Sequence, residues 1–460
     1  MRKGILKKKI SDFKSGLELI IQKAKWQSII NKIIVNDLFY ILITSGAFRM
    51  AYYFCLLNTS GYPDSNTYLN YNANILQGHV DILRTPVYPY FLRLIKLFGE
   101  GNLIQNVVLV QSIISFLAII IFYKIVNKVF INRAVTVIAS FIYGIMPSFV
   151  NFDKCILTES LSISASILFL YFIVSYLKKP NMLKAILFTL YVFVMIMLRP
   201  SFIILLPIIT ALWMLRIIFY KTDWKNCLSG LVASFFCVLL LLGYSNLNYI
   251  NNGCNCISIV SNINQIDIII NAEMYLYGND PEISTTIKSN LTEKQIFNDD
   301  IKSILLSKYS PERIANFIKN CIINQPTIYI FQAVKKIYYL SLTTTSVDYA
   351  NKKMGYLGTF AILFSRLISL PFLVIYILLV LDFIFFLVSY IKSKRVLWFK
   401  IILWSFVTFY LFTVIVGAQA EYHRLFVPAV PGILILLFSY FDMIFYSLDK
   451  VKINDYLKRS

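Results

Sequence analysis

The stretch IQNVVLVQSIISFLAIIIFYKIV, residues 104–126, indicates what kind of fold this chain adopts. It is apolar over most of its length and carries a single charged side chain, Lys124. A helix needs about 20 predominantly apolar residues to cross the hydrocarbon core of a bilayer. Inside lipid the backbone must satisfy its own hydrogen bonds, as it does in a helix. The stretch therefore predicts a membrane-spanning helix.

Similar apolar runs recur along the whole chain. Of the 460 residues, 58% are hydrophobic and 15% charged, and the mean hydropathy is +0.68. This composition is too apolar for a soluble protein, and runs of about 20 residues favour helices over the alternating decamers of a barrel. We predict an all-α membrane fold with about ten spans. They lie at residues 36–57, 104–126, 134–150, 161–177, 183–198, 201–219, 228–250, 361–391, 397–416 and 425–447.

The basic residues predict the orientation of these spans. The chain has 44 Lys and Arg against 23 Asp and Glu, a net charge of +21. Most of the basic residues fall at the two ends of the chain and in alternate short connections, such as those around Lys128, Lys179 and Arg395. Lys and Arg concentrate in cytoplasmic loops. We therefore predict a multi-pass protein of the cell (inner) membrane with both termini cytoplasmic, and the charge does not indicate a nucleic-acid partner.

This topology divides the chain into five parts. The predicted parts are a basic amphipathic segment on the cytoplasmic surface (1–35), a seven-span module (36–250) with its first outer loop at 58–103, an extracytoplasmic domain (251–360), three C-terminal spans (361–447) and a cytoplasmic tail (448–460). The basic start is interpreted as uncleaved, because the first strongly apolar run is long enough to span and no A-x-A-like site follows it.

The predicted extracytoplasmic domain contains its own local signals. Residues 293–308 and 312–323 have helical patterns, NDPE at 279–282 marks a turn, and 328–347 is interpreted as a helix on the outer surface. An oxidising compartment would allow Cys254 or Cys256 to pair with Cys321. Three free thiols are equally compatible with the sequence.

Ionisable residues from several loops map to the predicted outer face. They are Asp64, His79, Asp81, Arg84, Asp153, Lys154, Glu159, Arg199, Glu421, His423 and Arg424. Ionisable groups at membrane depth are costly unless they face one another or a water-filled cavity. Glu159 and Arg199 lie at span ends and are therefore candidate site residues. Ordinary solvation in a loop is the competing interpretation for each residue taken singly.

The stretch RTPVYPYFLRLIKLFG, residues 84–99, predicts an amphipathic helix lying on the outer leaflet. Thr85 is the expected cap, and Pro86 suits the first helical turn. The predicted apolar face consists of Val87, Tyr90, Phe91, Leu94, Ile95 and Phe98. Such a helix can form one wall of a groove for a lipid tail, and the alternative is a plain amphipathic connector.

Few classes of chemistry fit the remaining residues. The chain has two histidines and no HExxH, CxxC or DxD grouping, so no metal or other cofactor is indicated. A Walker-type loop and a Gly-rich cradle are also missing from the sequence. The energy for any reaction is therefore expected to come with the substrate.

Four short motifs in order resemble the GT-C class of membrane glycosyltransferases. They are YPDS-x-x-Y at 62–68, R-x-P-x-Y-P at 84–89, TES at 158–160 and R-x-x-x-P-x-x-P at 424–431. More narrowly, the chain resembles bacterial relatives of dolichyl-phosphate-mannose protein mannosyltransferases and of lipid A aminoarabinose transferases. That family usually has an acidic pair in the first outer loop, whereas here Ser65 follows Asp64. This departure leaves the subfamily and the need for a metal open.

The resemblance implies an inverting transfer of a hexose or pentose from a polyprenyl-phosphate donor to a hydroxyl of a lipid, glycan or protein. Asp64 would be the general base, alone or with Glu159 as a second catalytic carboxylate. Arg84, Arg199 and Arg424 would bind the donor phosphate. The predicted substrate-binding residues are Tyr68, Tyr88, Glu421 and His423, although tyrosines at this depth are also ordinary interface residues.

Other functions fit part of the sequence. An O-antigen or capsule polysaccharide polymerase would share the spans, the large late outer loop and a polyprenyl-linked substrate, but it needs no acid in the first outer loop. A sugar-lipid transporter would line a path with polar residues near mid-span, and the sequence has few of these, notably Arg49, Arg366 and Asp382. An acyltransferase would need a membrane-embedded His, and a non-catalytic scaffold is a further alternative.

Overall fold

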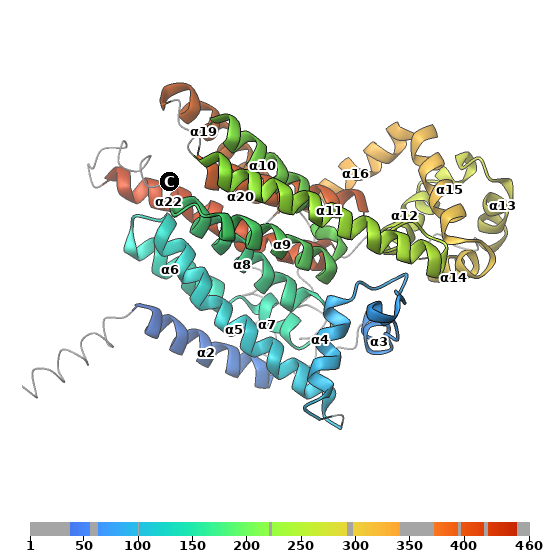
Figure 1. The fold of residues 1–460 in the computed structure, drawn as a ribbon, viewed down its shortest axis with the longest axis horizontal. Coiled ribbons are helices and arrows are strands. Elements are labelled where there is room, and N and C mark those ends of the chain that lie inside the picture. The colour runs from blue at the N-terminus through green and yellow to red at the C-terminus, as the bar shows by residue number, and fades with distance from the viewer. Residues whose placement is uncertain are drawn as a thin grey trace, which may run out of the picture.

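The computed structural model describes residues 37–55, 63–99, 101–219, 223–291, 298–340, 372–393, 397–417 and 422–448. Every regular element in these ranges is a helix (Figure 1). The all-α prediction is therefore confirmed for the described chain. The predicted cytoplasmic segment 1–35, residues 341–371 and the tail after residue 448 lie outside the described residues.

The membrane part is a bundle of long helices with two short ones among them. They are α2 (Asp37–Cys55), α5 (Leu103–Val129), α6 (Arg133–Gly144), α7 (Pro147–Asp153), α8 (Glu159–Lys178), α9 (Met182–Leu198), α10 (Leu205–Phe219), α11 (Trp224–Asn252), α19 (Phe372–Ser393), α20 (Trp398–Gly417), α21 (Tyr422–Phe426) and α22 (Val430–Leu448). The short turns η2 (Pro200–Ile204) and η5 (Val427–Ala429) precede α10 and α22. Each of the ten predicted spans overlaps one of these helices.

The number of spans is smaller by strict criteria. In the described residues, seven helical stretches are long and apolar enough to cross a membrane, and α2 is not among them. Met182–Leu198 and Val374–Val388 are apolar but shorter. The prediction of a multi-span bundle is confirmed, while the exact count of ten stays a prediction.

Local sequence signals set the helix ends. The Asn132 side chain accepts hydrogen bonds from the backbone N–H groups of Ala134 and Val135 and so begins α6. Asn181 begins α9 in the same way, as expected for N-cap residues that satisfy otherwise unpaired donors. Gly253, with φ of 67°, ends α11 in the left-handed conformation that glycine adopts without strain.

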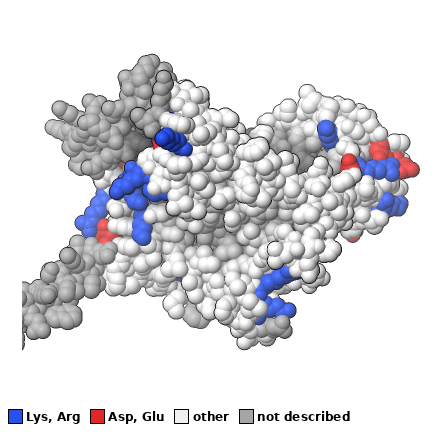
Figure 2. Space-filling model, viewed as in Figure 1, with Lys and Arg blue, Asp and Glu red and all other residues white. Residues whose placement is uncertain are grey.

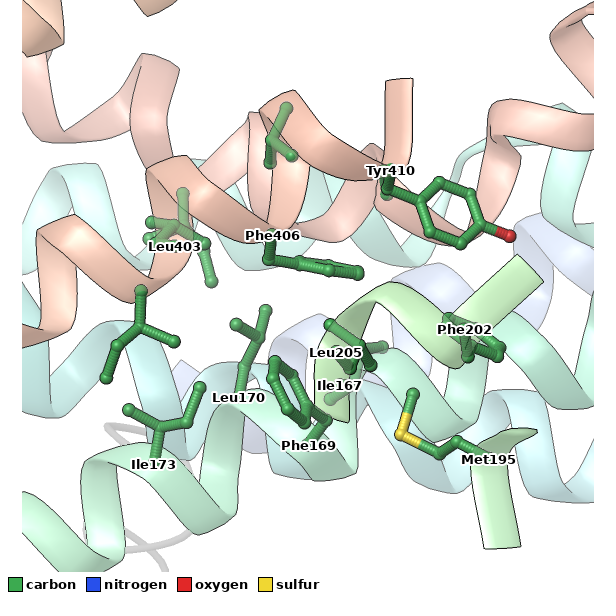
Figure 3. Close-up of a cluster of buried hydrophobic side chains, with 14 of the residues drawn as sticks. Ile167, Phe169, Leu170, Ile173, Met195, Phe202, Leu205, Leu403, Phe406 and Tyr410 are labelled. Atoms are coloured by element: carbon green, nitrogen blue, oxygen red, sulfur yellow. The ribbon is translucent and has the colours of Figure 1, made fainter. Parts of the chain in front are cut away.

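Helix α8 lies in the middle of the bundle and packs against α5, α9, α20 and α22. Figure 3 shows Phe169, Leu170 and Ile173 of α8 facing Leu403 and Phe406 of α20. The rings of Phe169 and Phe406 lie 5.5 Å apart. Because lipid tails are as apolar as these side chains, the packing is stabilised by close contact rather than by the hydrophobic effect. Buried polar contacts therefore have a large part in fixing how the helices are arranged.

The predicted extracytoplasmic domain forms a separate helical unit at one end of the bundle (Figure 1). It contains α12 (Val260–Asn271), η4 (Met274–Tyr277), α13 (Pro281–Asn290), α14 (Asp299–Lys308), α15 (Pro311–Asn324) and α16 (Pro326–Leu340). Its own core includes Ile269, Met274, Leu305 and Phe317. The predicted helices agree with α14, α15 and α16 where they are described, and Asp280 forms the predicted turn by capping the Ile283 N–H. We call this unit the outer domain.

The cysteines of the outer domain differ from the prediction. The structure joins Cys254 to Cys256 in the turn after α11. Cys321 is a free thiol, fully buried on α15 in the core of the outer domain. The predicted pairing of one of the first two cysteines with Cys321 is therefore wrong, and so is the alternative of three free thiols, because Cys254 and Cys256 pair with each other while Cys321 packs in the core.

The charges are distributed along the axis of the bundle. Figure 2 shows Lys and Arg side chains gathered at the end opposite the outer domain, and a mixed acidic and basic group at the tip of that domain. The connections from α5 to α6 and from α8 to α9 lie at the basic end (Figure 1). This distribution agrees with the positive-inside pattern, and the assignment of that end to the cytoplasm stays a prediction.

The first outer loop carries three short elements. They are α3 (Pro63–Leu69), η1 (Ile75–Gln77) and α4 (Val87–Lys96). The helix buries Tyr88, Pro89, Leu92 and Ile95 against the protein and leaves Leu94 exposed, as is Phe98 just beyond its end. Contact of the exposed apolar side chains with the outer leaflet stays a prediction. The predicted cap is wrong, since Thr85 is buried and Pro86 is the N-cap without a side-chain hydrogen bond. The helix packs onto α5 and α9, so contacts with protein decide its buried face.

Candidate active site

Asp64 lies in the first turn of α3 and faces the guanidinium group of Arg84. The Arg84 Nη2 to Asp64 Oδ1 distance is 2.6 Å. Arg84 is held in place locally, because its Nε donates to Thr67 Oγ1 at 2.7 Å and its guanidinium lies 4.3 Å above the ring of Tyr68. The Asp81 carboxylate accepts the backbone N–H of Arg84 at 2.7 Å. The loop therefore presents one carboxylate and one arginine as a unit.

Arg424 connects this unit to the bundle. It comes from α21, and its Nη2 donates to Asp64 Oδ2 while its Nε donates to Glu159 Oε1 at 2.7 Å. One planar fork thus joins two carboxylates that are far apart in the sequence, which the point charge of a lysine cannot reproduce. Glu159 lies in the first turn of α8, where the helix dipole favours a negative charge.

Arg199 completes the cluster from the end of α9. Its extended backbone conformation and the following Pro200 turn the chain into η2. Arg199 Nη1 lies 3.4 Å from Glu159 Oε1. Within the described residues, Arg199 Nη1 and Glu159 Oε2 are buried atoms without a hydrogen-bond partner. Buried polar groups normally have partners, so these two atoms are hydrogen-bonding groups left available inside the cluster.

The cluster has a net positive charge and one accessible acid. Three guanidinium groups and two carboxylates give a net charge of +1. The side chain of Asp64 is 35% exposed, whereas that of Glu159 is 1% exposed. Burial alone would raise the pKa of Asp64, but Arg424 and Arg84 outweigh it and lower the pKa to about 2. Asp64 is therefore ionised at neutral pH and is the carboxylate that a substrate can reach.

The structure brings together five of the predicted site residues, Asp64, Arg84, Glu159, Arg199 and Arg424. Tyr68 is buried beside them, and its hydroxyl accepts from Arg84 Nη1 at 3.1 Å. Tyr88 lies behind Tyr68, with ring centroids 5.0 Å apart, and is fully buried. Its hydroxyl donates to Gln111, so in this structure Tyr88 supports the site and does not line its surface.

Other ionisable residues of the predicted outer face have separate partners. His79 Nδ1 lies 3.2 Å from Asn251 Oδ1, and Lys154 donates to the backbone carbonyl of Tyr53. Asp153 forms an ion pair with Arg49 inside the bundle. Glu421 and the side chain of His423 lie outside the described residues, so their predicted role in substrate binding stays a prediction.

Sequence reasoning missed one residue that contacts both sides of this cluster. Gln111 is fully buried in α5 and bonds Tyr88 as well as the turn that leads to Glu159. A glutamine within an apolar span was a signal that could have found it, because a buried amide in lipid needs partners. As for metals, the described residues contain no group of three or more His, Cys, Asp or Glu side chains arranged to hold one. The expectation about cofactors stays a prediction.

A comparison with known protein families shows which class of proteins the chain resembles. Residues 83–244 match the family model described as dolichyl-phosphate-mannose-protein mannosyltransferase. This match confirms the resemblance to GT-C membrane glycosyltransferases. The matched part of the chain contains Arg84, Glu159 and Arg199, while Asp64 and Arg424 lie outside it. No curated protein matches the chain.

Two solved structures of an oligosaccharyltransferase from Archaeoglobus fulgidus resemble this chain weakly. AglB in complex with an inhibitory peptide and a dolichol-phosphate is 13% identical with a TM-score of 0.46, and the match covers 91% of this chain and 52% of that one. The enzyme tethered to an acceptor peptide is 12% identical with a TM-score of 0.42, covering 89% and 50%. The chain spans about half the length of these proteins, and no residue role is transferred from them.

Proposed function

We propose that the protein is an inverting glycosyltransferase that moves a hexose or pentose from a polyprenyl-phosphate donor to a hydroxyl of a lipid, glycan or protein. The observation that carries the proposal is an accessible carboxylate, Asp64, held between Arg84 and Arg424. The family match supports polyprenyl-phosphate-dependent glycosyl transfer in general. The reaction is placed at the outer face of the cell membrane, with both termini cytoplasmic, on the basis of the charge pattern.

The charge of the cluster suits the proposed donor. A sugar linked to a lipid through one phosphate is a phosphodiester with a single negative charge, which balances a site of net charge +1. Guanidinium groups bind phosphate oxygens through paired, charge-assisted hydrogen bonds. As the sugar leaves, negative charge grows on the phosphate, and the three arginines stabilise it in a largely dry site. Arg199 Nη1, which lacks a hydrogen-bond partner, is a suitable donor to that phosphate.

Asp64 is assigned as the general base. It would remove the proton from the acceptor hydroxyl while the phosphate leaves from the opposite face of the sugar, which inverts the anomeric carbon. With a pKa of about 2 in the free protein, Asp64 is a weak base. Donor phosphate that binds Arg84 and Arg424 draws them away from Asp64 and raises its proton affinity. Donor binding would therefore activate the base.

Glu159 has a different role in this proposal. It is almost fully buried and contacts both Arg424 and Arg199, so it holds two phosphate-binding groups at a fixed separation. A buried carboxylate without access to the acceptor is poorly placed to take its proton.

The activation of Asp64 predicts a specific pH dependence. We expect kcat to fall on acidification at a higher pH than kcat/KM does. The reason is that kcat/KM reports the free enzyme, whose Asp64 has a pKa of about 2, whereas kcat reports the donor complex, whose pKa is raised. Initial rates measured across an acid pH series give the pH at which kcat falls and the pH at which kcat/KM falls. If both fall at the same pH, the arginines are not shared between Asp64 and the phosphate.

The transporter alternative is less consistent with the described spans. A transport path needs polar groups that face a cavity near mid-membrane. Here Arg49 pairs with Asp153, and Asp382 lies 3.6 Å from Lys400, so these buried charges contact each other. Arg366 lies outside the described residues. The polymerase alternative shares the donor class but leaves the position of Asp64 unexplained.

The proposed function is tested by comparing the glycolipids and surface glycans of cells with and without the protein. The expected result is the loss of one sugar from one acceptor, together with accumulation of its polyprenyl-phosphate donor. This result would also identify the sugar and the acceptor. Shortened chains of an otherwise intact repeat unit would support a polymerase instead. Loss of the same sugar with the donor accumulating only at the cytoplasmic face would support a transporter.

A further inference from the structure

A single buried amide lies between the two halves of the proposed active site. Gln111 projects from α5 and is completely inaccessible to solvent. Its Oε1 accepts a hydrogen bond from the Tyr88 hydroxyl at 2.9 Å, and its Nε2 donates to the backbone carbonyls of Asp153 and Cys155, each at 3.0 Å. The oxygen and the nitrogen of this one amide therefore bond two different segments, α4 and the turn before α8.

The first of these segments determines the position of Arg84. Tyr88, on α4, packs edge-to-face against Tyr68, with the ring planes at 78°. Tyr68 in turn accepts a hydrogen bond from Arg84 and lies under its guanidinium group. Arg84 holds Asp64. A shift of Tyr88 would therefore displace the ring of Tyr68, and with it Arg84 and the proposed base Asp64.

The second segment is the turn between α7 and α8, residues 153–158. Its backbone is closed by the hydrogen bond from Leu157 N–H to the Cys155 carbonyl, the same oxygen that Gln111 contacts. The Asp153 carboxylate accepts from Ser160, next to Glu159, at 2.5 Å. The turn therefore sets where α8 begins and where Glu159 meets Arg424.

We propose that Gln111 is a positioning residue that sets the separation between the Asp64 side and the Glu159 side of the site. The proposal rests on the proposed function for its kinetic consequences. Arg424 must reach both carboxylates at once, so the two segments have to be held at one distance. Gln111 hydrogen bonds to both segments. It acts through Tyr88 and the turn, and it does not touch the substrate.

Gln111→Leu tests this role, because leucine has a similar size and makes no hydrogen bonds. We expect kcat for sugar transfer to fall about 10- to 100-fold, as for small misplacements of reacting groups, while KM for the donor changes little. Tyr88→Phe removes one of the three bonds and should have a smaller effect. The double variant should be no slower than Gln111→Leu alone, since the shared bond is already lost.

Thr189→Val is the matched control. Thr189 is a buried residue of α9 whose hydroxyl accepts from Trp213 Nε1 at 3.1 Å and donates to the Ala185 carbonyl at 2.9 Å. Its replacement removes equally buried hydrogen bonds that involve neither the turn nor α4. Its kcat should stay near that of the unaltered protein. An equal loss in both variants, or multiplied losses in the double variant, would mean that Gln111 only supports the general fold, and the proposal would be rejected.

A second readout does not depend on activity. Deuterium uptake measured by mass spectrometry on the full-length protein in detergent should rise together in residues 84–92 and 153–160 of Gln111→Leu, and in neither segment of Thr189→Val. Unchanged uptake in both segments would overturn the positioning role even if no sugar transfer is detected. An unaltered protein that transfers no sugar would defeat the proposed function, while the uptake result would still decide this inference.

Discussion

Asp64→Asn is expected to reduce kcat for sugar transfer by about 10²- to 10⁴-fold, the usual contribution of a positioned general base. Asparagine keeps the size of the side chain but does not accept a proton at neutral pH. The substitution also raises the net charge of the cluster from +1 to +2 and frees part of Arg84 and Arg424. Donor affinity should therefore be retained or increased, and the loss should appear in turnover. Single-turnover rates and a titration with the polyprenyl-phosphate sugar separate these two effects.

Glu159→Gln is the matched comparison, because it neutralises the other carboxylate of the same cluster. Breaking a buried ion pair from one side costs about 3–5 kcal/mol, so this variant should lower the thermal stability and the donor affinity more than Asp64→Asn does. Near-normal turnover in Asp64→Asn combined with an inactive, well-folded Glu159→Gln would mean that Glu159, not Asp64, is the general base. Normal turnover in both variants would favour the polymerase or transporter alternatives.

Arg424→Lys is expected to weaken donor binding strongly even though the positive charge is kept. Arg424 uses Nε for Glu159 and Nη2 for Asp64, and a lysine amine on its flexible stem does not span both carboxylates in the same plane. The loss of one charge-assisted hydrogen bond costs about 1.5–3 kcal/mol, which corresponds to a rise in the donor Kd of roughly 10- to 100-fold. Titration with the donor lipid measures this directly.

Arg93→Lys is the control for Arg424→Lys. Arg93 belongs to the first outer loop, but it donates to the Tyr71 carbonyl at 2.9 Å and contacts neither carboxylate of the cluster in the described structure. Its replacement should leave the donor Kd unchanged. If Arg424→Lys also binds the donor normally, Arg424 is an ordinary interfacial arginine and the phosphate must be bound elsewhere.

Sequence reasoning located the site because topology alone brings separate loops together. Counting spans and basic connections put Asp64, Glu159, Arg199 and Arg424 at one end of the bundle, and the structure shows these residues in contact. The pairing was not predictable, because periodicity does not show that one guanidinium would bridge two acids. The role of Gln111 was also hidden, since its partners are two backbone carbonyls and a tyrosine from other elements.

The parts of the structure that the sequence does not predict have a common physical cause. The sequence predicts an apolar face for α4, but it does not predict that Tyr88 and Leu92 pack against protein while Leu94 is exposed. Hydrophobicity alone does not distinguish lipid from a protein interior, because both are apolar. Similarly, cysteine spacing does not reveal that Cys321 is enclosed in the core of the outer domain. Long apolar runs predict membrane-spanning helices more reliably, because a helix must have a minimum length to cross the lipid.

The bridge made by Arg424 has a consequence for how the protein is synthesised. Asp64 and Arg424 are 360 residues apart, and the arginine lies at the start of the last helix pair, α21 and α22. With the predicted topology, the first outer loop is exported during translation long before its partner exists, and Asp64 faces Arg84 without Arg424 until the final span has been inserted. A chain that stops at Gly417 would contain most of the bundle and yet lack the arginine that joins Asp64 to Glu159. Under the proposed function, catalytic competence is thus acquired only as membrane insertion finishes.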